Sequence, residues 1–337
     1  MHLTALVQSR DHVCCRYRLT AFRPWLGRAG HTLELVPLPS GWFARWRLFR
    51  TLRHANVILQ RRLLSGWQLG VLRGAVRLLL YDVDDAVFLR DSYSPKGLHN
   101  PARLKRFAAV VRASDAVIAG NRFLHDEARR WTGSPSVHVI PSCVDPARYT
   151  PVDSRPAREG MQLLWIGSSS TLRGLETIRP LLEEMGARVP GLRLKMICDR
   201  FFQLSHLPID ECPWTEATEA AEIACADVGI SWVPDDLWSR GKCGLKVLQY
   251  MAAGLPVVAN PVGVHVEMVR HGETGFLVET PAQWVEAVRC LAADPSLRRR
   301  MGQAGRRLLE QEYSVQRGAA RWLDLLDALE RRLTRAG

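Results

Sequence analysis

The chain contains 337 residues, of which 47% are hydrophobic and 24% are charged, a length and composition typical of a soluble protein with two domains. It has no run approaching the roughly 18 uncharged apolar residues of a membrane-spanning helix, and its start lacks the basic region and cleavage site of a signal peptide. The net charge of +12 lies in the first half, where residues 1–150 hold 23 Lys and Arg against 10 Asp and Glu, so this half is expected to meet an anionic partner or to carry a solvated arginine-rich surface.

Apolar runs typical of β-strands alternate with segments of helical periodicity through the first half of the chain. The runs lie near 2–8, 32–37, 56–60, 77–81, 116–119 and 137–140, and the helical segments include 101–113 and 121–131. Alternation of this kind predicts βαβ units and a parallel sheet.

The second half repeats this alternation after a break at 150–160, which has two prolines and no periodicity. Strands are expected near 161–166, 192–198, 228–233 and 256–259, with helices from about 174, at about 296–311 and at about 316–334. We therefore predict an N-terminal domain at 1–155, a C-terminal domain at 156–312 and a final helix at 313–337 that packs back on the N-terminal domain. Both domains are expected to be Rossmann-like, which gives an α/β protein with a deep cleft between them.

The segment Trp42–Arg53 is both basic and aromatic, as segments at membrane surfaces are. No nucleic-acid recognition motif accompanies the charge, so an anionic membrane is favoured over nucleic acid as the partner. The eight cysteines are spread singly, without a C-x-x-C pair, which indicates reduced thiols and neither zinc nor disulfides. We expect a cytoplasmic protein, attached peripherally to the inner face of a membrane.

The strongest functional signal is a pair of lysines around an expected helix start. A helix is predicted to begin near Leu245 and to end at Gly254. Lys242 and Lys246 flank its N-terminus, where cations are unfavourable unless an anion is bound. The pattern therefore predicts a phosphate or diphosphate, with two solvated surface lysines as the alternative. Gln249 shares a helix face with Lys246 and would meet a ribose about one turn away.

This region resembles the C-terminal signature of glycosyltransferase family 4. Residues 249–259, Gln-Tyr-Met-Ala-Ala-Gly-Leu-Pro-Val-Val-Ala, and their continuation to Val278 resemble the family pattern, and 139–145 resembles its hinge-region motif. The G-K-C-G-x-K form of 241–246 is similar to the donor loop of one subgroup. The resemblance implies a GT-B fold, with the acceptor on the N-terminal domain and a nucleotide sugar on the C-terminal domain.

The chain departs from the family where two glutamates are expected. Gly241 stands at the position of the first, which in the family usually sits near the donor sugar, and Gln249 replaces the second, which typically binds the donor ribose. A glutamine amide can also bind hydroxyl groups. Lys242, Asp235 or Asp236 are candidates to compensate for the first glutamate.

Further donor-binding candidates follow predicted strands. The turn at 167–171 offers backbone N–H groups and hydroxyls to a diphosphate, with Arg173 as the cation, although a simple helix cap would be equally polar. Asp199 and Trp214 lie where the resemblance places the nucleobase, and a buried tryptophan is the alternative for the latter. The predicted donor-binding residues are Gly167, Ser168, Ser169, Ser170, Arg173, Asp199, Trp214, Lys242, Cys243, Gly244, Leu245, Lys246 and Gln249.

The first half offers its own polar residues at strand ends. Three carboxylates lie in 81–85, Tyr-Asp-Val-Asp-Asp, a D-x-D pattern that holds a metal in GT-A enzymes. We predict no metal, because two Rossmann-like halves do not match GT-A architecture. Asp84 and Asp85 are instead expected to orient the acceptor hydroxyl or act as a base, with helix capping as the alternative, and Lys242 completes the catalytic candidates. Basic residues at 16–18 and 60–62 are positioned to reach an anion.

The combined interpretation is a retaining, metal-independent glycosyltransferase that uses a nucleotide diphosphate sugar and no cofactor. Its partners would be this donor, a glycan or lipid-linked acceptor in cell-surface synthesis, and an anionic membrane surface. A nucleotide-sugar epimerase of the same fold and a silent sugar-nucleotide-binding subunit remain as alternatives, the latter because both expected glutamates are missing.

Overall fold

The computed structural model describes residues 1–132, 136–151 and 160–336. Its contacts divide the chain into two compact units. Unit 1 consists of Met1–Cys143, Asp236–Cys243 and Val315–Gly337, and unit 2 of Val144–Asp235 and Gly244–Ser314. Most of the predicted linker and the expected domain boundary at 155/156 lie outside the described residues.

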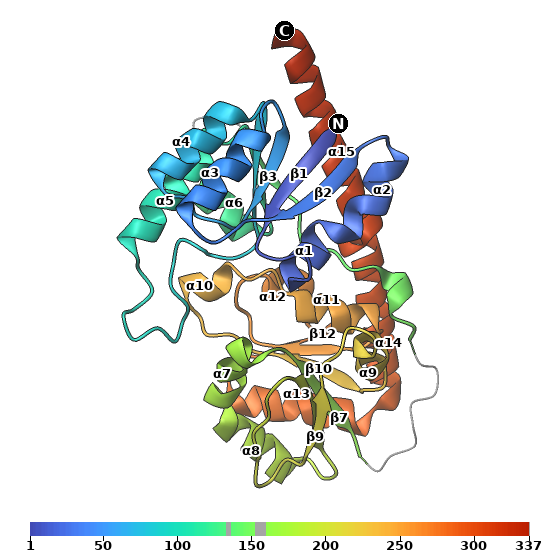
Figure 1. Ribbon diagram of the computed structural model, residues 1–337. Coiled ribbons are helices and arrows are strands. Elements are labelled where there is room, and N and C mark those ends of the chain that lie inside the picture. The colour runs from blue at the N-terminus through green and yellow to red at the C-terminus, as the bar shows by residue number, and fades with distance from the viewer. Residues whose placement is uncertain (133–135, 152–159, 337) are drawn as a thin grey trace. The chain divides into compact units, whose positions relative to one another are not determined.

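Unit 1 is built on a six-stranded sheet in which every neighbouring pair is parallel (Figure 1). Its strands are β1 (His2–Val7), β2 (Thr32–Pro37), β3 (Asn56–Gln60), β4 (Leu78–Val83), β5 (Ala116–Ala119) and β6 (Val137–Val139). The spatial order is β2-β1-β3-β4-β5-β6, so the chain reverses its direction of winding between β1 and β3. In open α/β sheets, ligands bind outside the carboxyl ends of the strands at such a switch point.

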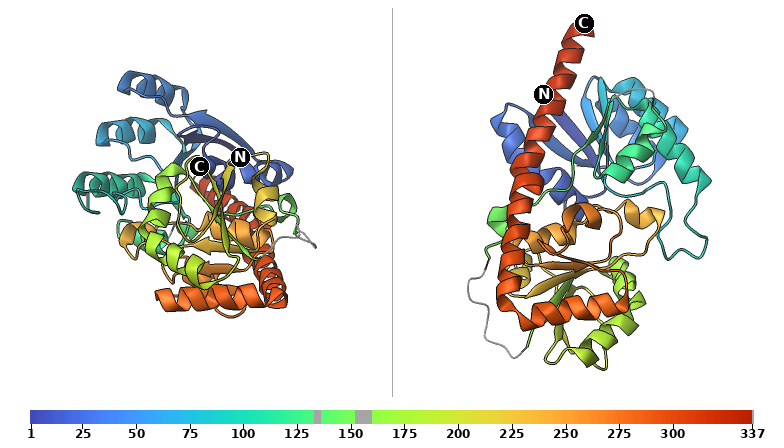
Figure 2. Two further views of the ribbon diagram at one scale, coloured as in Figure 1. Left: turned by 90° about the horizontal axis from the view of Figure 1, so that it is seen from below. Right: turned by 180° about the vertical axis from the view of Figure 1, so that it is seen from behind.

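Helices cover both faces of this sheet because successive strand residues point to opposite sides. Leu6, Leu59 and Leu79 pack with α3 (Trp42–Thr51), α4 (Gly66–Ala75), α5 (Pro101–Ala113) and α6 (Arg122–Arg129). Ala5, Ile58 and Leu80 pack on the other side with α1 (Val13–Arg18), η1 (Thr20–Phe22), α2 (Arg23–Arg28) and the C-terminal helix α15 (Val315–Ala336). The right-hand view of Figure 2 shows α15 lying along this face of the unit 1 sheet.

Unit 2 has a second parallel six-stranded sheet, in the order β12-β11-β10-β7-β8-β9. Its strands are β7 (Gln162–Ile166), β8 (Arg193–Cys198), β9 (Ile209–Pro213), β10 (Val228–Ser231), β11 (Val257–Ala259) and β12 (Gly275–Leu277). The switch point lies between β7 and β10. The predicted α/β fold with two parallel sheets is confirmed, although β9 and β12, the two edge strands, were not predicted.

The helices of unit 2 place its polar loops. They are η2 (Pro146–Arg148), α7 (Ser169–Thr177), α8 (Arg179–Arg188), α9 (Glu219–Ala224), α11 (Leu245–Ala252), α12 (His265–Met268), α13 (Pro281–Ala293), α14 (Pro295–Leu308) and the π-helical turn η3 (Leu309–Tyr313). Helix α11 begins at the predicted residue, after Gly244 in the left-handed conformation with φ of 62°. Helix α7 begins at Ser169, five residues before the expected start, because Ser168 and Thr171 form a capping box.

Candidate functional site

A cavity of about 370 Å³ opens in unit 1 at the carboxyl ends of its strands. Its lining includes Gln8 after β1, Leu38 after β2, Arg61 after β3 and Asp85 after β4. These strands surround the switch point between β1 and β3, the place where an open parallel sheet usually binds its ligand. Every residue that lines the cavity belongs to unit 1, including Trp238 of the short helix α10 (Leu237–Arg240).

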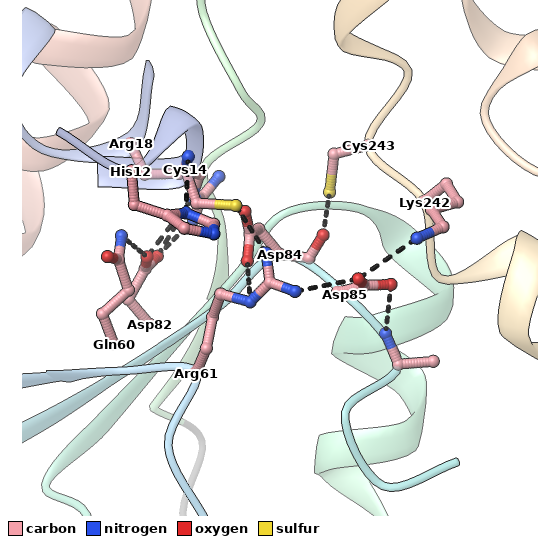
Figure 3. Close-up of polar contacts among 11 residues, drawn as sticks. His12, Cys14, Arg18, Gln60, Arg61, Asp82, Asp84, Asp85, Lys242 and Cys243 are labelled. Atoms are coloured by element: carbon pink, nitrogen blue, oxygen red, sulfur yellow. Dashed lines mark hydrogen bonds and ion pairs between the residues drawn. The ribbon is translucent and has the colours of Figure 1, made fainter. Parts of the chain in front are cut away.

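Two of the predicted catalytic carboxylates, Asp84 and Asp85, share one arginine beside this cavity (Figure 3). The guanidinium of Arg61 lies 3.3 Å from Asp84 Oδ1 and 2.9 Å from Asp85 Oδ2, and Lys242 Nζ lies 3.2 Å from Asp85 Oδ2. Arg61 has a φ of 59°, a left-handed conformation that non-glycine residues rarely adopt. Such backbone strain persists where surrounding contacts hold the residue, here its pairing with both carboxylates.

The third carboxylate of this segment, Asp82, has a different environment. It forms a fully buried ion pair with Arg18 and accepts a hydrogen bond of 3.3 Å from Gln60 Nε2. Arg18 is 1% exposed and is therefore not available to a ligand, in contrast to the sequence-based expectation that it reaches an anion. Within the part of the chain that the structure describes, no cluster of His, Cys, Asp and Glu could hold a metal ion.

His12 faces the same cavity and was not predicted from the sequence. Its Nδ1 accepts a hydrogen bond of 3.2 Å from the backbone N–H of Cys14, so the neutral ring carries its proton on Nε2. Burial and then the nearby charge of Arg61 lower the pKa of His12. The neutral ring therefore offers the cavity a hydrogen-bond donor. Its position in the loop that follows β1, as the N-cap of α1, is the signal that would have identified it.

The loop at 240–243 is held in place by hydrogen bonds within unit 1. Asn121 Nδ2 donates hydrogen bonds to the carbonyl oxygens of Arg240 at 3.1 Å and Lys242 at 2.9 Å, and Cys243 Sγ donates to the carbonyl oxygen of Asp84 at 3.2 Å. Lys242 Nζ also lies 3.4 Å from the ring centroid of Trp238. This side chain therefore has two partners within unit 1, the indole and the Asp85 carboxylate.

Close packing explains why residue 241 is a glycine. A Cβ at this position would lie 2.6 Å from the Cβ of Ala86 and 2.8 Å from its backbone nitrogen. Real Cβ atoms do not approach other heavy atoms so closely, and one of the two atoms belongs to the backbone and cannot rotate away. The glutamate expected here from the family resemblance therefore does not fit.

In unit 2, the predicted phosphate-binding turn after β7 already holds a carboxylate. Asp199 Oδ1 accepts a hydrogen bond of 2.6 Å from the backbone N–H of Ser169, and its Oδ2 accepts one of 2.8 Å from Ser169 Oγ. These bonds at the start of α7 lower the pKa of Asp199. Gly167 is the first residue of this turn, and a Cβ at this position would lie 2.3 Å from the indole of Trp165.

Lys246 lies in the first turn of α11, half-buried, with Nζ 4.6 Å from the ring centroid of Trp165. The neighbouring His265 is fully buried, and burial lowers its pKa to about 4. Its Nδ1 lies 2.9 Å from the carbonyl oxygen of Asn260 and its Nε2 lies 2.9 Å from Ser231 Oγ, so the neutral ring donates from Nδ1 and accepts at Nε2.

Gln249 and Trp214, predicted at the ribose and the nucleobase, are joined by a buried polar chain. Gln249 Nε2 donates to Tyr149 Oη at 3.1 Å, and Tyr149 Oη donates to Glu219 Oε1 at 3.4 Å. Glu219 Oε2 in turn accepts a hydrogen bond of 2.6 Å from Trp214 Nε1. Gln249 is only 3% exposed and Trp214 is 41% exposed. The indole therefore presents a surface to solvent while the amide is enclosed.

The chain resembles known glycosyltransferases in sequence and in structure. Residues 237–308 match the family described as glycosyl transferases group 1. A D-inositol 3-phosphate glycosyltransferase of Pseudarthrobacter chlorophenolicus is 30% identical over 192 residues, which cover 50% of this chain and 44% of that protein. A sucrose-phosphate synthase from Thermosynechococcus elongatus covers all of both chains with a TM-score of 0.74 at 19% identity. HepE of Anabaena, solved with UDP and glucose, covers 97% of this chain and 100% of its own with a TM-score of 0.73 at 14% identity.

The chain has the GT-B fold. The segment 237–308, which matches the family of group 1 glycosyl transferases, begins at α10, passes through the loop that carries Lys242, and continues to the end of α14. The aligned region spans less than two thirds of the curated relatives that it matches, 44% in one and 64% in another.

The predicted site residues of this GT-B protein do not form one cluster. Asp84, Asp85, Lys242 and Cys243 come together in unit 1, and Ser169 and Asp199 come together in unit 2. Gln249 and Trp214 are linked through Tyr149 and Glu219, which were not predicted. Arg173 is exposed on α7, and Gly244, Leu245 and Lys246 form the start of α11.

Proposed function

We propose that the protein transfers a sugar from a nucleoside diphosphate sugar to a hydroxyl group of an acceptor. The observation that supports this most directly is the group 1 match, because it covers the lysine-bearing loop and helix start that the sequence singles out for a diphosphate. HepE, which shares the fold, has been solved with UDP-glucose. A donor of this class is therefore the first choice for this chain.

In this proposal the donor binds unit 2, with its diphosphate near Lys246 and the turn at 167–170. In the reaction the bond between the anomeric carbon and the diphosphate breaks, a bond to the acceptor oxygen forms, and the hydroxyl proton passes to the departing diphosphate. Lys246 and the N–H groups at the start of α11 would stabilise the charge that develops on the leaving group. This requires no metal, and we propose that the configuration at the anomeric carbon is retained.

Unit 1 would hold the acceptor in its cavity. Asp85 lines this cavity, and its carboxylate is oriented by Arg61 and Lys242. An oriented carboxylate can accept a hydrogen bond from a hydroxyl group of the acceptor, which fixes the direction of the lone pairs on that hydroxyl oxygen. Asp84 and Lys242 support that geometry, and His12 adds a donor on the same cavity wall. These residues position the acceptor, and no nucleophile of the protein is needed.

The proposal is tested by screening nucleotide sugars for thermal stabilisation and for release of nucleoside diphosphate. We expect one donor to stabilise the protein, and Lys246→Met to weaken its binding about 10- to 100-fold, because a hydrogen bond to a charged group contributes about 1.5–3 kcal/mol. Lys105→Met, an exposed lysine of α5, serves as the control that leaves binding unchanged. Absence of binding by every nucleoside diphosphate sugar would reject the donor site.

A silent sugar-nucleotide-binding subunit is the second candidate, supported by the tight packing of Gly241 where the family resemblance places a glutamate. Such a subunit would bind the donor but release no nucleoside diphosphate with any acceptor. An epimerase would instead convert the donor to a different nucleotide sugar without acceptor. Product analysis in the same assay separates both from a transferase.

We also propose that unit 1 contacts an anionic membrane surface through α3 and α4. Trp42, Phe43 and Trp67 are 65%, 52% and 51% exposed, and their rings pack against one another. Exposed aromatics beside arginines are typical of membrane interfaces. Among the described residues no helix is long and apolar enough to cross a membrane. Sedimentation with anionic but not neutral vesicles, reduced by replacing Trp42 and Trp67 with serine, is the expected result.

A further inference from the structure

The cavity of unit 1 has an unusual balance of charge. Five arginines line it, and the only carboxylate among the residues that line it is Asp85. Arg61 is neutralised by Asp84 and Asp85, and Asp85 also forms an ion pair with Lys242. The other four arginines contribute positive charge that the described lining does not balance.

None of these four arginines has an ion pair among the described residues. Arg45 Nε donates to the carbonyl oxygen of Pro39 at 2.8 Å, and Arg103 Nη1 donates to that of Leu89 at 2.6 Å. Such bonds orient a guanidinium group without neutralising its charge. Arg103 and Arg106 stand three residues apart on α5 and therefore share a face of the helix.

Arg62 is distinguished from the other three by a buried donor atom. Its Nε is buried and has no hydrogen-bond partner within the described residues. A buried donor without a partner is costly, and the cost is higher for a charged group. Burial, followed by the nearby positive charges of Arg45 and Arg61, lowers the pKa of Arg62. An anion in the cavity would provide the missing acceptor and relieve the repulsion among the three arginines.

We propose that this cavity binds a phosphate ester of the acceptor, with Arg62 as the main anchor and Arg45, Arg103 and Arg106 around it. This inference rests on the proposed glycosyl transfer and names the chemical class of its acceptor. A phosphate monoester carries about −1.5 to −2 charges at neutral pH and three acceptor oxygens, which suits several guanidinium groups better than a single carboxylate does. A cavity of about 370 Å³ is in the range of small-ligand sites.

The position of the cavity also fits an acceptor whose phosphate lies apart from its reacting hydroxyl. Asp85 forms part of the lining after β4, whereas Arg62 follows β3 and Arg106 lies on α5. The phosphate would contact the arginine side chains of the lining, and the reacting hydroxyl would donate a hydrogen bond to Asp85, which would orient it. A soluble sugar phosphate and the phosphate monoester head group of phosphatidic acid share this chemistry.

The experiment compares hexose phosphates with the matching neutral hexoses as ligands and as acceptors. In the wild-type protein we expect the phosphates, and inorganic phosphate more weakly, to raise the midpoint of thermal unfolding in a saturable manner. Arg62→Gln is expected to weaken binding and to raise KM for the phosphorylated acceptor about 10- to 100-fold, with little change in kcat. Arg129→Gln, an exposed arginine of α6 that does not line the cavity, is the matched control.

Further arms separate the outcomes. If Arg62→Gln fails to fold, Arg106→Gln replaces an exposed side chain of the same lining and should give the same direction of change. Binding to phosphatidic acid vesicles, but not to hexose phosphates, that is lost in Arg62→Gln would identify a lipid head group as the source of the phosphate. Equal binding of phosphorylated and neutral hexoses by the wild type, or unchanged phosphate binding in both variants, would overturn the proposal. Binding of the nucleotide sugar near Lys246 is measured separately. If the wild-type protein binds phosphate esters but no nucleotide sugar, the transfer reaction is rejected and the phosphate site is not.

Discussion

Replacement of Gly241 by alanine tests whether packing against Ala86 requires the glycine at this position of the 240–243 loop. The φ of Gly241 is −76°, which alanine adopts without strain, so the effect comes from the added methyl group alone. That methyl would lie 2.6 Å from the Cβ and 2.8 Å from the backbone nitrogen of Ala86. Overpacking of this kind costs about 1–3 kcal/mol, and Gly241→Glu should cost at least as much without improving turnover.

Urea unfolding measures the loss of stability, and alkylation of Cys243 followed by mass spectrometry measures undocking of the loop. Cys243 is buried and donates to the carbonyl oxygen of Asp84, so its labelling should accelerate in Gly241→Ala. Adding Ala86→Gly removes the closest contact and should restore part of the stability, while the contact with the backbone nitrogen remains. Gly70→Ala, inside α4 with open space at its Cβ, should instead stabilise by about 1 kcal/mol.

Wild-type stability and wild-type labelling of Cys243 in Gly241→Ala would refute this reasoning. The loop would then have room for a side chain, and the absence of the expected glutamate would have no steric cause. If Ala86→Gly restores the full stability of Gly241→Ala, the whole loss comes from the contact between the methyl group added at position 241 and the methyl group of Ala86.

Three further results are expected. The pKa of His265 is about 4 in the folded protein against about 6.5 in the unfolded chain, so this residue contributes about 3 kcal/mol to the free energy of unfolding above pH 6.5, and the contribution is lost as the pH falls towards 4. Urea unfolding between pH 6.5 and 4 should show this loss of stability in the wild type and not in His265→Gln. Asn121→Asp keeps the cap of α6 but removes both hydrogen bonds to the carbonyl oxygens of the 240–243 loop, so the free energy of unfolding should fall by about 1–3 kcal/mol. Unchanged stability would mean that other contacts hold the loop. Asp199→Asn removes a negative charge that would compete with a phosphate group for the N–H of Ser169, so titration calorimetry should show several-fold tighter binding of a nucleoside diphosphate. Weaker binding would mean that the Asp199 carboxylate contacts the ligand directly.

Local patterns in the sequence were enough to predict the order of the main elements. Strands such as β1 and β3 are buried apolar runs, and α11 follows Gly244 and ends before Gly254, because glycine readily adopts the left-handed conformation required at these ends. The edge strands β9 and β12 were missed because they are less completely buried than the central strands of the sheet, and β9 in addition carries the charged residues Asp210 and Glu211.

Contacts between distant segments decided the rest. The sequence places Lys242 beside a helix start, but only the fold brings Asp85, which lies 157 residues earlier, within 3.2 Å of its Nζ. Burial of Gln249 against Tyr149 and the steric exclusion of a side chain at Gly241 likewise depend on which surfaces pack together. The arginines of the unit 1 cavity come from α3, the end of β3 and α5. A parallel sheet gathers such separate segments at its carboxyl edge, so their charges act together only in the tertiary structure.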